Sequence, residues 1–179
     1  MEESSPEFLR VLCVENFSVL KIQRIMNAKL VQISVNPRGG VPKTRVPSAC
    51  LGLERVEGDQ QNYSGHGGPL RAACLFSLEV IEKLQREGHP IAPGTIGENL
   101  TISGLDWSEI KPGVRLQIGE AVVEITEYTR PCAKIKASFR DGEFMRPWQE
   151  THPGESRVYA KILTQAEVRE GDEVRIVET

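Results

Sequence analysis

Glycine and proline recur along this sequence at intervals too short for long helices or long strands. They gather in clusters such as Pro37-Arg38-Gly39-Gly40, Lys111-Pro112-Gly113 and Pro153-Gly154. Glycine supplies turn conformations and proline interrupts hydrogen-bonded ladders, so each cluster predicts a break between elements. A chain divided in this way is expected to form many short strands.

Between these breaks, several segments have the residue pattern of strands, mostly an alternation of apolar and polar residues. These segments are Lys29–Val35, Arg71–Phe76, Leu100–Ile102, Val114–Ile118, Ala121–Tyr128, Val158–Leu163 and Glu173–Val177. One clear helix is predicted over Leu78–Glu87, with Ser77 as its N-cap and Gly88 after its last turn. The pattern predicts a mainly β fold, a β-barrel with a few short helices.

Residues 1–25 are expected to form an N-terminal extension to one domain that spans residues 26–179. Ser4, Pro6 and Glu7 resemble the first turn of a helix. The apolar residues that follow keep an imperfect helical spacing. The extension is therefore interpreted as either a short helix or a partly disordered segment.

Composition narrows the possible classes of function. The 22 basic and 25 acidic residues give a net charge of -3, which does not favour a nucleic-acid partner. The acidic N-terminus differs from a secretory signal, and the sequence has no apolar run long enough to span a membrane. The four cysteines are widely spaced, so neither a disulfide framework nor a structural zinc site is expected. A cytoplasmic protein is predicted.

The first of three loops that could carry chemistry precedes the predicted strand at Arg71. Gly67 and Gly68 could bring backbone N–H groups close to an anion, and the Arg71 guanidinium could grip a phosphate. His66 could take part in proton transfer. An ordinary polar turn before a buried strand explains the same residues about equally well.

The second loop contains Gly97-Glu98-Asn99 and leads into a short strand. A carboxylate and an amide held together could read the donor and acceptor pattern of a heterocycle. On these residues alone, a plain hairpin corner is the more common explanation.

The third loop, Thr129-Arg130-Pro131-Cys132-Ala133-Lys134, follows the predicted strand Ala121–Tyr128. Proline cannot extend a ladder, so the chain should leave the sheet here and present Cys132 at a strand end. Cations close to a thiol favour the thiolate, which is also a good ligand for a soft metal. A buried structural cysteine is the alternative, and it is the interpretation given to Cys13, Cys50 and Cys74.

Taken in order, these loops resemble the MOSC family, named after the C-terminal domain of molybdenum-cofactor sulfurase. The resemblance covers residues 28–178 and includes the predicted strand Val158–Leu163 with the Val168–Asp172 segment after it. The loop residues that carry it are Gly58-Asp59, His66-Gly67-Gly68-Pro69, Arg71, Gly97-Glu98-Asn99-Leu100, Arg130-Pro131-Cys132 and Lys134.

The resemblance implies a β-barrel-rich fold that binds a molybdenum–molybdopterin cofactor. It implies that Cys132 is both the metal ligand and a catalytic residue, with His66 assisting proton transfer. Phosphate binding is expected from Gly67, Gly68, Arg71 and Lys43, and ring recognition from Glu98 and Asn99. The remaining expected cofactor-binding residues are Gly97, Thr129 and Arg130.

The resemblance also implies a reaction class and a partner. Standalone bacterial members of similar architecture reduce N-hydroxylated compounds such as hydroxylaminopurines and amidoximes. The expected partners are such a small substrate and a separate electron-donor protein, a flavin or haem reductase. The alternative is a non-catalytic carrier, in which Cys132 holds a persulfide or the domain delivers cofactor to another enzyme.

Overall fold

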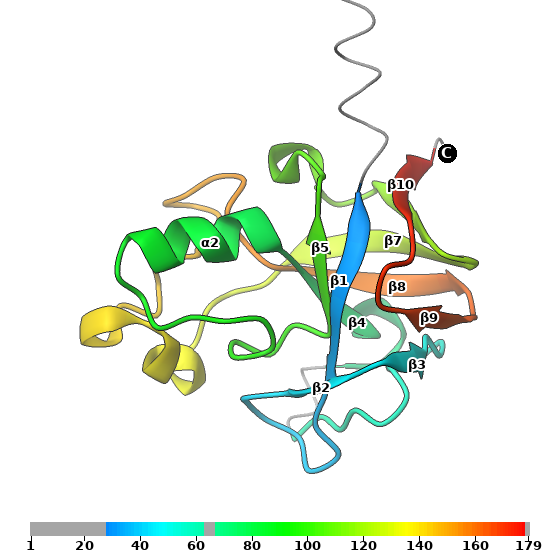
Figure 1. The fold of residues 1–179 in the computed structure, drawn as a ribbon, viewed down its shortest axis with the longest axis horizontal. Coiled ribbons are helices and arrows are strands. Elements are labelled where there is room, and N and C mark those ends of the chain that lie inside the picture. Colours follow the sequence, from blue (N-terminus) through cyan, green and yellow to red (C-terminus); the bar gives the residue numbers. More distant parts are fainter. Residues whose placement is uncertain (1–27, 63–66, 178–179) are drawn as a thin grey trace, which may run out of the picture.

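The computed structural model describes residues 28–62 and 67–177 (Figure 1). The predicted extension over residues 1–25 and the candidate His66 lie outside the described residues. No helix in these two ranges is long and apolar enough to cross a membrane.

The regular elements of the described chain are mostly short strands, with one longer helix, which confirms the mainly β prediction. Eight strands pair in the order β10-β6-β7-β8-β4-β5-β1-β2, and β3 pairs with β9 in a small second sheet. The elements are β1 (Lys29–Val35), β2 (Thr44–Val46), β3 (Ser48–Cys50), β4 (Ala73–Ser77), α2 (Leu78–Arg86), β5 (Leu100–Ser103), β6 (Arg115–Ile118), β7 (Ala121–Tyr128), β8 (Val158–Thr164), β9 (Glu167–Arg169) and β10 (Val174–Val177).

The prediction of a barrel was wrong, because the large sheet does not close. Its outer strands are β10 and β2, each short and each paired on one side. One isolated bridge, Lys29 to Glu173, and a few backbone hydrogen bonds link the start of β1 to the segment entering β10. In Figure 1 the β1–β5 part of the sheet runs across the direction of β7 and β8, so the sheet is strongly bent but open.

The helix α2 connects the two strands that pair in parallel, β4 and β5. Ser77 caps it as predicted, since its Oγ accepts a hydrogen bond from the Val80 N–H at 3.3 Å. Val80, Ile81 and Leu84 face the core. This connection places Asn99, just before β5, beside Cys74 of β4, where the Asn99 N–H donates to the Cys74 carbonyl at 2.7 Å.

The core is a continuous cluster of aliphatic side chains from both halves of the sheet. Leu30, Ile33, Leu75 and Leu100 are fully buried within it. Burial of each such side chain contributes on the order of 2 kcal/mol, which makes the sheet a rigid support for the loops at its edge. Trp107 belongs to this core and donates from Nε1 to the Ser156 carbonyl at 2.7 Å.

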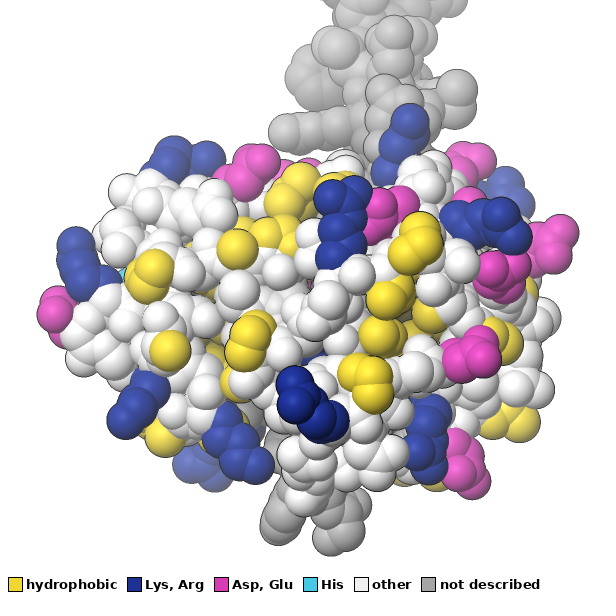
Figure 2. All heavy atoms as spheres, turned by 60° about the horizontal axis from the view of Figure 1, so that its bottom comes forward, with side chains coloured by type: hydrophobic (Ala, Val, Ile, Leu, Met, Phe, Trp, Pro, Cys, Tyr) yellow, Lys and Arg dark blue, Asp and Glu magenta, His cyan; other side chains and the backbone are white. Residues whose placement is uncertain are grey.

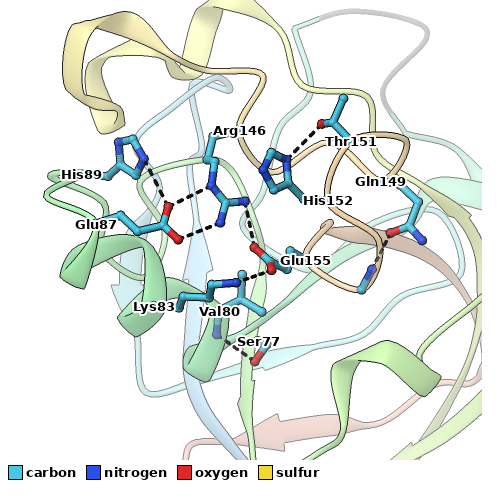
Figure 3. A network of polar contacts seen from close by, with 11 residues as sticks. Ser77, Val80, Lys83, Glu87, His89, Arg146, Gln149, Thr151, His152 and Glu155 are labelled. Atoms are coloured by element: carbon cyan, nitrogen blue, oxygen red, sulfur yellow. Dashed lines mark hydrogen bonds and ion pairs between the residues drawn. The ribbon is translucent and has the colours of Figure 1, made fainter.

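The long connection from β7 to β8 contains short 3₁₀ turns and packs against α2. Figure 3 shows the polar contacts that hold it there. Arg146 donates to both carboxylate oxygens of Glu87 at 2.7 and 2.8 Å and forms an ion pair with Glu155. Lys83 contacts the same Glu155 at 2.5 Å. His89 is buried beside this network and accepts from the Arg140 N–H.

Candidate functional site

A pocket opens where the three predicted loops meet the ends of β4 and β8. Four of its residues are basic members of these loops or of the loop before β2, and two are cysteines. The described residues that line it are Gly40, Val41, Lys43, Gln60, Gln61, Asn62, Gly67, Arg71, Cys74, Ile96, Gly97, Asn99, Arg130, Cys132, Lys134, Ile135, Arg157 and Tyr159. Most of the predicted site residues therefore share one cavity.

The outer edge of the pocket, which we call the rim, consists of Arg130, Cys132 and Lys134. The β7 strand ends at Tyr128 and Cys132 immediately precedes a 3₁₀ turn, so the chain leaves the sheet as the proline predicted. All three rim side chains are exposed, whereas Pro131 between them is buried. The Arg130 guanidinium lies 5.7 Å from the centre of the Trp148 ring. The rim thus presents an accessible thiol between two cations.

The opposite side, which we call the inner wall, consists of Cys74, Asn99, Arg157 and Tyr159. Asn99 is buried, and its side chain is held at both ends. Its Oδ1 accepts from the Cys74 N–H at 3.1 Å, and its Nδ2 donates to the Ser34 carbonyl at 3.2 Å. The amide is therefore fixed by the protein rather than free to adapt to a ligand.

Beneath Asn99, Asp59 collects hydrogen bonds from three parts of the chain. Its Oδ2 accepts from Asn99 Nδ2 at 2.9 Å and from Lys43 Nζ at 2.6 Å, and its Oδ1 accepts from the Asn36 N–H at 2.8 Å. The Lys43 and Asp59 side chains are only 10% and 2% exposed. This buried carboxylate locks the loop before β2 to the inner wall.

Glu98 lies behind the pocket wall instead of lining it. Its side chain is fully buried, and Oε1 accepts from the Gly94 N–H at 2.6 Å, while Oε2 has no partner among the described residues. Burial raises the pKa of this carboxyl above its usual range. Direct recognition of a ring by Glu98 would need the carboxyl to reach the pocket, which it does not do in this structure.

The two cations predicted to hold a phosphate already have carboxylate partners. Arg71 donates to Glu127 through Nε at 2.5 Å and Nη2 at 3.0 Å, and its guanidinium lies 5.3 Å from the Tyr159 ring centre. Lys43 is paired with Asp59, as described above. Both line the pocket, but a ligand would have to share or displace these contacts.

The remaining predicted residues divide between the pocket and its supports. Gly67 and Gly97 line the cavity, and a Cβ added to Gly97 would come within 3.0 Å of Val41. Gly68 precedes the 3₁₀ turn Pro69–Arg71 and does not line the pocket. Thr129 is buried behind it, and its N–H donates to the Arg157 carbonyl at 2.9 Å.

Sequence reasoning missed three pocket residues on the inner wall: Cys74, Arg157 and Tyr159. Cys74 was interpreted as an ordinary core cysteine, but it faces the same cavity as Cys132. Burial raises the pKa of its thiol, and burial also raises the pKa of Tyr159 to about 12. Cys74 and Tyr159 lie opposite each other on β4 and β8, a register that the sequence did not reveal.

Charge is distributed unevenly around the cavity. Of the described residues that line it, five are Lys or Arg and none is Asp or Glu, namely Lys43, Arg71, Arg130, Lys134 and Arg157. Figure 2 shows basic side chains scattered over one face of the molecule, several of them beside acidic ones. A pocket of this composition favours a ligand that carries negative charge.

Known proteins share sequence similarity with this chain. The MOSC domain model matches residues 62–175. The uncharacterized protein YflK of Bacillus subtilis (strain 168) is 30% identical over 169 residues, 91% of this chain and 74% of its own. Protein YiiM of Escherichia coli (strain K12) is 32% identical over 102 residues, which are 54% of this chain and 45% of YiiM.

Solved structures show the same fold. The crystal structure of a hypothetical protein superposes with a TM-score of 0.68 at 26% identity, covering 88% of this chain and 72% of that one. YiiM from Escherichia coli gives a TM-score of 0.64 at 24% identity, covering 85% and 70%. Sheet, pocket and sequence together define a MOSC-type domain. The chain belongs to the MOSC family.

Proposed function

We propose that this protein binds a molybdenum–molybdopterin cofactor and uses it to reduce N-hydroxylated compounds. The observation that carries the proposal is the exposed thiol of Cys132 at the rim of a pocket lined by five cations and, among its described residues, no carboxylate. A thiolate is a suitable ligand for a soft metal centre, and the cations suit the phosphate of such a cofactor. Membership of the MOSC family supports the same cofactor class.

The described residues fit this cofactor in a specific way. Cys132 would bind the metal from the rim, where the extended backbone at this residue and the buried Pro131 fix the direction of approach. Arg130 and Lys134 line the same pocket and would add positive charge on the rim beside a bound cofactor. Asn99, held rigidly by Cys74 and Asp59, would form a fixed wall for the ligand.

The bound cofactor would supply two-electron chemistry at its metal, and the protein would supply orientation and charge. Overall, an R–NHOH substrate would take up two electrons and two protons and yield R–NH₂ and water. Rim and inner wall would together exclude bulk water from one side of the substrate. The electrons would come from a separate flavin or haem reductase.

The exposure of Cys132 favours a second candidate, a sulfur or cofactor carrier. An accessible thiol at a pocket rim can be reached by another protein, which a persulfide carrier requires. Mass spectrometry separates the two functions. A labile adduct of about 32 Da on Cys132 in metal-free protein, consistent with a persulfide, would favour the carrier.

The experiment that tests the reductase is metal analysis and turnover of protein made in a cofactor-competent host. Wild type is expected to hold stoichiometric molybdenum and to reduce benzamidoxime or 6-N-hydroxylaminopurine with an artificial donor. Cys132→Ala should lose most of both, whereas Cys50→Ala, a half-buried thiol outside the pocket, should keep both. Full molybdenum and full activity in Cys132→Ala would overturn the assignment of Cys132.

A further inference from the structure

Arg157 is a buried cation with unused hydrogen-bonding capacity. It directly precedes β8 and is 8% exposed. Its Nη1 donates to the Ile96 carbonyl, and its Nε has no hydrogen-bond partner within the described parts of the chain. Arg157 lines the pocket, so a ligand there can approach its guanidinium, although Nε itself is sealed from solvent.

A buried guanidinium is costly unless an acceptor meets its charge. Among the described residues, the carboxyl of Glu98 interacts electrostatically with Arg157. No hydrogen bond joins Arg157 Nε to Glu98 Oε2, since each of these atoms lacks a partner among the described residues. The described residues therefore do not provide an acceptor for every N–H group of the Arg157 guanidinium.

The other buried or half-buried cations of the pocket differ in this respect. Lys43 is 2.6 Å from the Asp59 carboxylate, and Arg71 is bonded to both oxygens of Glu127. Arg130 and Lys134 are exposed on the rim, where water can solvate them.

We propose that Arg157 is the principal ligand of an oxyanion subsite in the inner wall, a role the family resemblance does not assign to it. The subsite would take a phosphate-type group, with the guanidinium donating to its oxygens. Lys43 and Arg71, which stay paired with Asp59 and Glu127, would add positive electrostatic potential at the subsite. The proposal rests in part on the proposed function, because the phosphate of the cofactor and a free inorganic oxyanion are both sources of this chemistry.

The direct test uses the cofactor-free full-length protein and inorganic phosphate, with binding followed by calorimetry and by the shift in Tm. Wild type is expected to bind phosphate and to gain Tm as phosphate rises. Arg157→Gln should bind about 10- to 100-fold more weakly, the effect of losing one charged hydrogen-bonding group. Arg175→Gln, an exposed arginine of β10 outside the pocket, is the matched control and should bind like wild type.

A second variant separates a built subsite from diffuse attraction. Arg130→Gln removes a rim cation that lines the same cavity and should weaken phosphate binding much less than Arg157→Gln. The subsite would be overturned if both variants lost the same phosphate affinity, or if the wild-type protein did not bind phosphate. If Arg157→Gln does not fold, Arg157→Lys takes its place, because it keeps the buried charge. It should bind phosphate more weakly than wild type, since lysine cannot form the same planar fork.

Comparison of loaded and empty protein identifies the source of the anion. If the cofactor phosphate occupies the subsite, cofactor-loaded protein should no longer respond to added phosphate, and Arg157→Gln should release cofactor faster. If loaded protein still binds phosphate through Arg157, the subsite serves a second anion such as an anionic substrate. Phosphate binding through Arg157 without any molybdenum in wild type would uphold the subsite and count against the proposed reductase.

Discussion

The inner wall and the rim face the same pocket, but their side chains are held in different ways. On the inner wall, Asn99 has protein partners at both ends of its amide and sits on the buried carboxylate of Asp59. On the rim, Cys132 and Lys134 are exposed on a 3₁₀ turn. The sheet thus supplies a preorganised surface, while the exposed thiol of Cys132 comes from a connection outside the ladder.

The largest expected difference between the two regions is in stability. Asp59→Ala would leave the buried Lys43 ammonium without its carboxylate and would remove one of the two acceptors of Asn99 Nδ2, so it should cost about 3–5 kcal/mol in the free energy of unfolding. Lys134→Ala on the rim should change it by no more than about 0.5 kcal/mol. Urea denaturation of both variants measures this. Similar losses in the two proteins would show that the inner wall is not the stiffer region.

The second-largest expected difference is in the reactivity of the two thiols that line the pocket. Cys132 is exposed, whereas Cys74 is 4% exposed and its pKa is raised by burial. Iodoacetamide should therefore modify Cys132 faster than Cys74 by on the order of 100-fold at neutral pH, because only a thiolate that is accessible reacts. Peptide mass spectrometry of timed samples gives both rates. If Cys74 reacts as quickly, the inner wall opens readily in solution.

A smaller effect concerns two carboxyl groups whose contributions to the free energy of unfolding should change with pH in opposite directions. Burial raises the pKa of Glu98, so the folded state keeps a proton that the unfolded state loses above pH 4.5, and stability falls as pH rises. Arg146 lowers the pKa of Glu87, so its contribution is present above pH 4.5 and is lost as pH falls further.

Gln variants test these signs by thermal unfolding between pH 3 and 7. Glu98→Gln should gain stability relative to wild type as pH rises. Glu87→Gln should lose up to about 1 kcal/mol at neutral pH, a small value because the Glu87 side chain is 34% exposed, and this deficit should disappear in acid. Parallel pH profiles for the two variants would contradict the contrast between a desolvated acid and a paired acid.

Much of the fold followed from local patterns. The alternation over Lys29–Val35 and Ala121–Tyr128 marked two strands with the bounds that the structure has, and Ser77 marked the start of α2. The three-residue strands β2, β3 and β9 were not predicted, because so short a segment carries too little alternation. The open sheet was also missed, since closure depends on how distant edges meet and not on any one segment.

The site was predictable where chemistry and local backbone coincide, as at Cys132 beside Pro131. It was less predictable where the role of a residue depends on its neighbours in space. Arg157 stands directly before a predicted strand, but its burial results from its place opposite Thr129 and next to Ile96. Glu98 showed the converse, since a polar residue in a glycine-rich loop proved to bond to the Gly94 turn behind the wall.

The hydrogen bond from the Thr129 N–H to the Arg157 carbonyl means that the chain leaves and re-enters the sheet at one place. Residues 130–156 therefore behave as a cassette with both ends anchored side by side. Such a segment can be exchanged between related proteins without altering the register of β7 and β8. The rim of the pocket could then change through residues 130–156 alone, with the hydrogen bonds of the inner wall kept.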